Sequence, residues 1–133
     1  MTSDTNENSG PAPRVLTDRE LVDLLAGQRF GALAAVKKDG HPHLSTVLYE
    51  WDPEERTVRI SSTEDRLKVR QLRNDPRTAL HVNGGNVWSF AVAEGDAEIV
   101  PAPEAGPGRV WITIKVSRLY GTALDVADAA DEG

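Results

Sequence analysis

The sequence of 133 residues contains no cysteine, a single methionine and few aromatic side chains. The absence of cysteine excludes disulfides, thiol catalysis and thiolate metal sites, so any redox chemistry would depend on a bound cofactor. No apolar run approaches the ~20 residues of a membrane helix, and the N-terminus lacks the charged-then-apolar pattern of a signal peptide. These absences favour a cytoplasmic protein.

Positive charge is also scarce, since 15 Lys and Arg face 21 Asp and Glu and the formal net charge is −6. This balance argues against bulk nucleic acid or an anionic membrane as a partner. The segment ISSTEDRLKVRQLRNDPR, residues 60–77, is the exception and carries five basic side chains. A local cationic cluster in an acidic chain indicates a small anionic ligand.

The length predicts one domain with one hydrophobic core. Residues 1–13 are polar and contain Pro and Gly, so they are expected to form a disordered N-terminal tail. The acidic residues 122–133 are expected to form a second tail. The predicted cofactor-binding domain therefore spans residues 14–121.

Helical signals occur twice along the chain. In TDRELVDLLAG, residues 17–27, Thr17 and Glu20 have the spacing of a capping box, and the leucines share one face. A second, shorter helix is expected after Ser62, which with Asp65 has the spacing of a weaker capping pair. Both helices interrupt an otherwise extended sequence.

Alternating apolar and polar residues predict strands elsewhere. Asp39-Gly40 suits the turn of a hairpin, and the first three strands are expected to form a β-meander. About six short antiparallel strands with two short helices predict a mainly β fold, a small β-barrel with the helices at its rim. The expected strands cover residues 30–37, 43–51, 57–62, 78–82, 88–93, 97–100 and 109–121.

A strand-to-helix junction lies inside the basic segment. A helix N-terminus offers unpaired N–H groups and a partial positive charge, which favour a phosphate. Guanidinium and ammonium groups beside hydroxyl donors can neutralise that phosphate, whereas Arg70 and Arg73 fall further along and are expected to face solvent. The pattern alone favours the alternative of ordinary solvated helix charges. The residues of the predicted anion pocket are Ser61, Ser62, Thr63, Arg66 and Lys68.

The sequence resembles a known superfamily over most of residues 14–124. The stretches that carry the resemblance are FGALAAVKKDGHPHLSTVLYEWD, VRISSTEDRLKVRQLRNDPRTAL, VAEGDAEIV and VWITIKVSRLYGTA. They are similar to the pyridoxamine 5'-phosphate oxidase-like, FMN-binding split β-barrel superfamily of flavin and deazaflavin oxidoreductases. Within it, the chain resembles the short actinobacterial F420-dependent reductases, a branch that includes biliverdin reductase.

The resemblance implies a cofactor site at the interface of a homodimer. The cofactor phosphate would lie on SSTEDRLK, which contains the predicted anion pocket. The tricyclic ring would lie against the strand that holds Leu44, Ser45, Thr46 and Val47. The segment containing Trp88 would reach toward the partner's cofactor and substrate, although a core or dimer-packing role for Trp88 is the alternative.

Two features depart from the pattern of the family. Many relatives carry a proline where this chain has Thr46, and this departure would change backbone hydrogen bonding near the ring. Relatives also place a helical insert where only residues 101–109 join two strands here. The shorter link implies a more open substrate site or a segment absent from this sequence.

The function implied by the resemblance is that of an F420-dependent oxidoreductase that transfers a hydride from reduced F420 to a small conjugated or heteroaromatic acceptor. No catalytic side chain is expected, because the cofactor carries the difficult chemistry and a proton can come from solvent or a nearby Arg or Lys. No metal is expected either, since His41 and His43 lack a third ligand. Lys37 and Lys38 are candidates to meet the anionic oligoglutamate tail of F420.

Three alternatives remain open at this point. The same fold could bind FMN and act as a flavin-dependent oxidoreductase. It could bind F420, a flavin or a tetrapyrrole without turnover. A weaker alternative is a small barrel for single-stranded nucleic acid, which the few aromatics and the negative net charge oppose.

Overall fold

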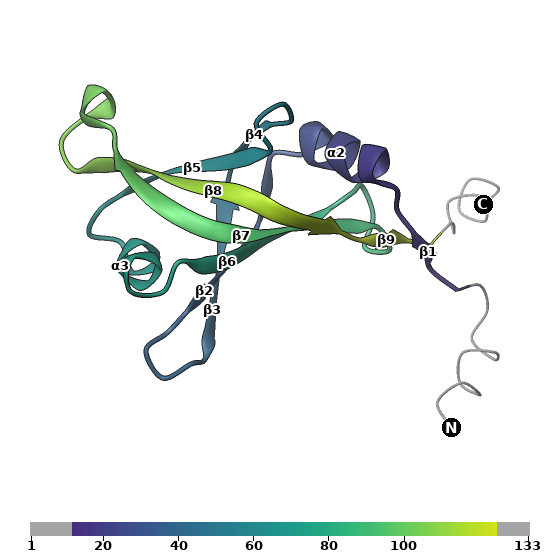
Figure 1. The fold of residues 1–133 in the computed structure, drawn as a ribbon, viewed down its shortest axis with the longest axis horizontal. Coiled ribbons are helices and arrows are strands. Elements are labelled where there is room, and N and C mark those ends of the chain that lie inside the picture. Colours follow the sequence, from purple (N-terminus) through teal and green to yellow (C-terminus); the bar gives the residue numbers. More distant parts are fainter. Residues whose placement is uncertain (1–11, 125–133) are drawn as a thin grey trace.

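The computed structural model describes residues 12–124 (Figure 1). The two predicted tails lie largely outside these residues, and the domain limits stay a prediction. No helix among the described residues is long and apolar enough to cross a membrane. The elements are β1 (Arg14–Val15), α2 (Asp18–Gly27), β2 (Phe30–Val36), β3 (Pro42–Leu48), β4 (Glu50–Asp52), β5 (Thr57–Thr63), α3 (Leu67–Asn74), β6 (Arg77–Asn83), β7 (Phe90–Pro101), the 3₁₀ turn η1 (Pro103–Ala105), β8 (Arg109–Tyr120) and β9 (Thr122–Ala123).

Seven strands form one curled antiparallel sheet, in the order β3-β2-β6-β7-β8-β5-β4. β1 and β9 pair separately, near the point where the described chain begins and ends (Figure 1). The sheet curls so that β3, at one edge, approaches β5 near the other edge. The predicted mainly β, split-barrel fold with two α-helices is therefore confirmed.

The expected β-meander is wrong in its second half. The stretch predicted as one strand over residues 43–51 divides at Tyr49 into β3, which pairs with β2, and β4, which pairs with β5. β5 then pairs on its other side with β8, so the first hairpin and the β4–β5 pair lie at opposite edges of the sheet. The inward and outward alternation continues through Tyr49, so the division reflects a change of pairing partner from β2 to β5.

Two further elements differ from expectation. The strands expected at 88–93 and 97–100 are one continuous strand, β7, which bends at a bulge between Glu94 and Gly95. The capping pair expected between Ser62 and Asp65 is wrong, since α3 begins one residue after Arg66 and has no side-chain cap. By contrast, the Thr17 and Glu20 capping box of α2 is confirmed, with both of its hydrogen bonds present.

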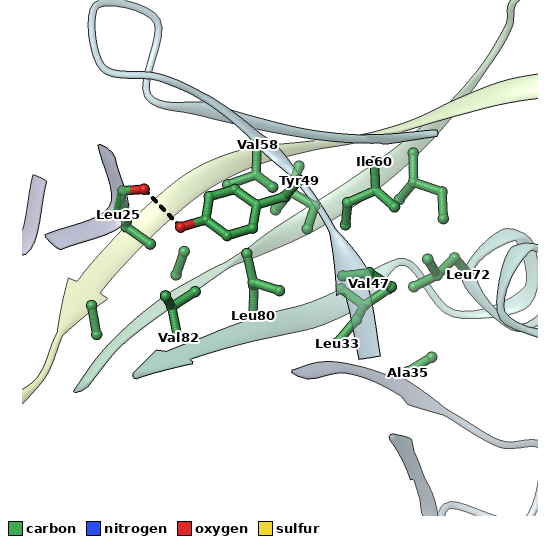
Figure 2. Close-up of a cluster of buried hydrophobic side chains, with 14 of the residues drawn as sticks. Leu25, Leu33, Ala35, Val47, Tyr49, Val58, Ile60, Leu72, Leu80 and Val82 are labelled. Atoms are coloured by element: carbon green, nitrogen blue, oxygen red, sulfur yellow. Dashed lines mark hydrogen bonds between the residues drawn. The ribbon is translucent and has the colours of Figure 1, made fainter. Parts of the chain in front are cut away.

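The core lies inside the curl of the sheet and under the two helices (Figure 2). Tyr49 is the polar member of this cluster and is only 8% exposed. Its hydroxyl donates a 2.7 Å hydrogen bond to the Leu25 carbonyl, one of the last four carbonyls of α2, which have no partner within the helix. Tyr49 therefore fastens the end of α2 to the sheet.

Replacing Tyr49 with Phe is expected to lower the free energy of unfolding by about 1–2 kcal/mol, because the Leu25 carbonyl loses its partner. Burial raises the pKa of Tyr49 to about 12 from an ordinary 10.0. The folded protein thus holds the phenol proton more tightly than the unfolded chain, and stability is lost as the pH rises from 10.0 toward about 12. Denaturant unfolding at several pH values should show this loss in the wild type and a smaller one in Tyr49→Phe. If the free energy of unfolding fell equally with pH in the two proteins, the prediction would be wrong.

Candidate functional site

A cavity of about 390 Å³ opens where β3, β5 and the start of α3 meet. It lies at the strand-to-helix junction that the sequence indicated, and we call it the junction pocket. Seven of the predicted cofactor-binding residues line it together with three others. The lining residues are Thr46, Val47, Leu48, Ile60, Ser61, Ser62, Thr63, Arg66, Lys68 and Arg109.

The turn between β5 and α3 sets the positions of the polar side chains. The Thr63 hydroxyl donates to an Asp65 carboxylate oxygen at 2.7 Å, and the Glu64 N–H donates to the Gly108 carbonyl at 2.9 Å. These bonds hold the turn against the start of β8. Arg66 follows as the extended residue immediately before α3, and Lys68 lies in the first helical turn.

The electrostatics of the junction pocket favour an anion. Neither Arg66 nor Lys68 forms an ion pair with any described residue, and the first turn of α3 contains no acidic side chain. Partial burial and the nearby charge of Arg66 both lower the pKa of Lys68. Cations at a helix N-terminus oppose the helix dipole, and the Asp65 carboxylate, whose pKa the charge of Arg66 helps to lower, offsets part of this cost. An anion bound between Arg66 and Lys68 would offset more of it.

Sequence reasoning missed Arg109, the first residue of β8. The register of β5 and β8 places Arg109 directly opposite Thr63, and its guanidinium donates to the Ser61 hydroxyl. Arg109 also has no carboxylate partner among residues 12–124. Nothing in the local sequence indicates this role, because it depends on pairing between strands about 50 residues apart.

The structure does not place the other three predicted residues, Leu44, Ser45 and Trp88, in the junction pocket. Leu44 is 65% exposed on β3, and Ser45 is half-buried on the same strand; neither lines the junction pocket. Trp88 is 52% exposed in the loop between β6 and β7 and also lies outside that pocket. Whether these residues meet a cofactor stays a prediction.

A neighbouring cavity of about 220 Å³ shares the lining residues Leu48 and Ser61 with the junction pocket. In the second cavity the Arg59 guanidinium lies 4.0 Å from the centre of the Trp111 ring. The cations and hydroxyls of the junction pocket suit a phosphate. The neighbouring cavity has a mixed lining, since Arg29, Glu50 and Arg59 lie beside Leu48, Tyr49 and Trp111. The residues of the junction pocket therefore fit the phosphate of a cofactor.

Comparison with known protein families supports the same reading of the fold. The family model described as "Pyridoxamine 5'-phosphate oxidase" matches residues 17–130. The chain belongs to the pyridoxamine 5'-phosphate oxidase family. The match contains every residue of the junction pocket.

Solved structures of similar shape carry names that refer to two kinds of cofactor. An F420 reductase is 27% identical over 73% of this chain and 93% of its own, with a TM-score of 0.64. An FAD-binding protein from Mesorhizobium loti is 21% identical over 86% of this chain and 100% of its own, with a TM-score of 0.73. An FAD-binding protein from Mycobacterium smegmatis is 17% identical over 85% and 99%, with a TM-score of 0.68. The last two likenesses show the shared fold of the family.

Proposed function

We propose that this pyridoxamine 5'-phosphate oxidase family member is an F420-dependent oxidoreductase that reduces a small conjugated or heteroaromatic acceptor. The observation that carries the proposal is the junction pocket, which Arg66, Lys68 and Arg109 line without an ion-pair partner among residues 12–124. In the same pocket the Ser61 hydroxyl accepts from Arg109, and the Thr63 hydroxyl donates to Asp65. This donor set suits a single phosphate. The similarity to an F420 reductase favours the deazaflavin over a flavin.

In this proposal the protein binds and orients, and the bound deazaflavin supplies the hydride. Arg66, Lys68 and Arg109 hold the phosphate, while Leu48 contributes an exposed apolar side chain to the lining of the pocket. Fixing the phosphate restricts the ring to the neighbouring cleft, which lowers the entropy cost of bringing donor and acceptor together. The proton that completes the reduction comes from solvent or from an Arg or Lys near the ring.

We also propose that the active species is a homodimer. Phe30 lies opposite Leu48, and Ala34 lies opposite Leu44, so these four side chains share the outer face of the β2–β3 hairpin. Phe30, Leu44 and Leu48 are 61–69% exposed. A partner seated on this apolar face would cover the open side of the junction pocket, because Leu48 also lines that pocket.

Phe30→Glu is expected to convert the dimer to a monomer, because a carboxylate would be buried without a partner in the apolar face, beside Leu48. Sedimentation velocity would measure the change in mass. Val15→Glu is the matched control, since Val15 is 77% exposed on the separate β1–β9 sheet. A Phe30→Glu protein that remains dimeric would place the interface elsewhere.

Separate titrations with F420, FMN and FAD, followed by tryptophan fluorescence, test the proposed function. Tighter binding of F420, followed by turnover of reduced F420 with an acceptor, would support it. Preference for a flavin would keep the site and change the chemistry to that of a flavin oxidoreductase. Tight F420 binding without turnover of any acceptor would instead indicate a carrier protein.

A further inference from the structure

A cavity of about 480 Å³ lies on the outer face of β2 and β6, beside the loop that joins β6 to β7. The residues of this face alternate along the two strands with the buried Leu33 and Leu80. The volume is within the range of small-molecule sites. We call this cavity the amide pocket, and its polar lining residues are Gln28, Thr46, His81, Asn83 and Asn86.

The lining of the amide pocket contains no Asp, Glu, Lys or Arg, although these residues make up 27% of the chain. A carboxylate or phosphate that entered the cavity would lose its water without gaining a cation. The lining therefore favours an uncharged ligand. Its other members are Phe30, Gly31, Ala32, Gly85 and Val87.

Three carboxamide side chains supply the hydrogen-bonding groups of the amide pocket. Those of Gln28 and Asn83 form no hydrogen bond with any residue that the structure describes. The Asn86 Oδ1 accepts a 2.7 Å bond from the Trp88 N–H, which leaves the Asn86 NH₂ group as a donor. Because a carboxamide both donates and accepts, such a lining suits a ligand that carries carbonyl and N–H groups.

The amide pocket also has the surfaces that a planar molecule needs. The His81 ring stacks on Phe90, with ring centres 5.1 Å apart and planes at 17°, so a second ring supports the imidazole. Beside His81 on β2 lies Ala32, whose short side chain leaves the neighbouring sheet surface low. A flat heteroaromatic molecule could lie over Ala32 against His81.

The strand register places the amide pocket next to the junction pocket. Thr46 lines both cavities. It lies opposite Ala32 on β2, and Ala32 lies opposite His81 on β6. Since neighbouring strands are about 5 Å apart, His81 lies about 10 Å from Thr46 across the outer face. A cofactor ring on the strand that holds Thr46, as the family resemblance implies, would border a molecule over Ala32.

We infer that the amide pocket is the acceptor site, and that it selects an uncharged, planar heteroaromatic molecule with a carboxamide or lactam group. This inference rests on the proposed function. In the reaction a hydride moves from reduced F420 to a carbon of the acceptor, and one proton completes the product. The acceptor thereby gains two electrons, and one of its double bonds becomes single. The amide pocket contributes by holding the acceptor beside the donor.

The test uses two probes of equal size, quinoline-3-carboxamide and quinoline-3-carboxylate, which differ in charge. Each would be titrated into the ¹⁵N-labelled full chain, with and without saturating F420, while the side-chain amide signals of Gln28, Asn83 and Asn86 are followed by NMR. The variants would be Asn83→Leu and Asn74→Leu. Asn74 is the matched control because it is exposed at the end of α3, outside the amide pocket.

The carboxamide is expected to shift these amide signals and to bind about tenfold more tightly than the carboxylate, with F420 bound as well as without it. Asn83→Leu should weaken carboxamide binding about fivefold, because a hydrogen bond is lost, whereas Asn74→Leu should bind as the wild type does. Asn83→Lys should reverse the preference by supplying a cation for the carboxylate. Thermal unfolding would check that each variant is folded.

Equal binding of the two probes, or titrations that leave the three amide signals unmoved, would overturn the inference and leave the proposed function standing. Displacement of the carboxamide by F420 would also overturn the inference, because the cavity would then hold the cofactor. Absence of F420 binding would overturn the proposed function, and the acceptor role with it. The F420 titration therefore separates the two failures.

Discussion

Arg66→Ala combined with Lys68→Ala is expected to weaken cofactor binding by about a hundredfold, the largest loss of affinity that we expect from any change in this protein. Each cation would lose a charge-assisted hydrogen bond to the phosphate, and each such bond is worth about 1–3 kcal/mol. Isothermal titration calorimetry on the two single variants and the double variant would measure the loss. Arg109→Ala should act in the same direction, because Arg109 lines the same pocket.

The stability of the cofactor-free protein should not fall when Arg66 and Lys68 are replaced. Partial burial and, to a smaller extent, the charge of Arg66 lower the pKa of Lys68, and both cations lie at the unfavourable end of the α3 dipole. Removing them should therefore leave the unfolding temperature unchanged or slightly higher. A variant that simply misfolds would lose both affinity and stability, so the two measurements separate a binding role from a structural one.

Two further variants sharpen this test. Arg66→Lys keeps the charge but loses the forked donor pair of the guanidinium, and it should recover only part of the lost affinity. Lys115→Ala removes a cation outside the pocket and should bind the cofactor as the wild type does. Wild-type affinity in both Arg66→Ala and Lys68→Ala would mean that the phosphate binds elsewhere.

The sequence predicted the elements whose determinants are local. The capping box of α2 needs only Thr17 and Glu20, three residues apart, and it forms as expected. The turn at Asp39-Gly40 also forms as expected, because Gly40 adopts a φ of 92° that side chains with a Cβ rarely adopt. Both features depend on residues close together in the sequence and need no tertiary contact.

Elements that depend on distant partners were not predictable in the same way. Residues 43–51 alternate as one strand, yet β3 ends at Leu48 because its partner β2 begins at Phe30, and the chain then pairs with β5 instead. β7 is continuous because β6 and β8 pair along its two sides and carry it through the bulge. Neither partner can be deduced from the alternation of residues within one segment.

The residues of the candidate site were also predictable only where they lie in one short segment of the sequence. The cations and hydroxyls of residues 61–68 were predictable because one short segment contains them, and the structure brings them together with Thr46 and Val47. Arg109 was missed because strand pairing alone brings it to Ser61. The cavity between α3 and the turn of the β2–β3 hairpin was only partly predictable from the sequence. Lys37 and Lys38 were expected to meet an anion, whereas Arg70 and Arg73 were expected to face solvent. They are indeed exposed, but the fold of the hairpin onto α3 makes them the other wall of a cavity.

Gly95→Ala is expected to lower the free energy of unfolding by about 3 kcal/mol, although it removes no interaction. At the bulge of β7, the backbone of β8 passes so close that a Cβ on residue 95 would lie 2.1 Å from the Lys115 carbonyl oxygen and 3.2 Å from Ile114 Cγ2. The obstructing oxygen belongs to the backbone of a strand paired on both sides, so it has little freedom to move aside. Chemical denaturation would measure the loss.

Gly27→Ala is the control for this prediction, because a Cβ at residue 27 would have no atom within 4 Å and Gly27 ends a helix. Alanine there should leave stability unchanged or raise it by up to about 1 kcal/mol. Equal stability of Gly95→Ala and wild type would mean that β7 and β8 lie further apart than described.

The bulge also affects function, since β8 carries Arg109 into the junction pocket. If β8 must move to admit the new methyl group, Arg109 moves with it, so Gly95→Ala should weaken cofactor binding even at temperatures where the protein remains folded.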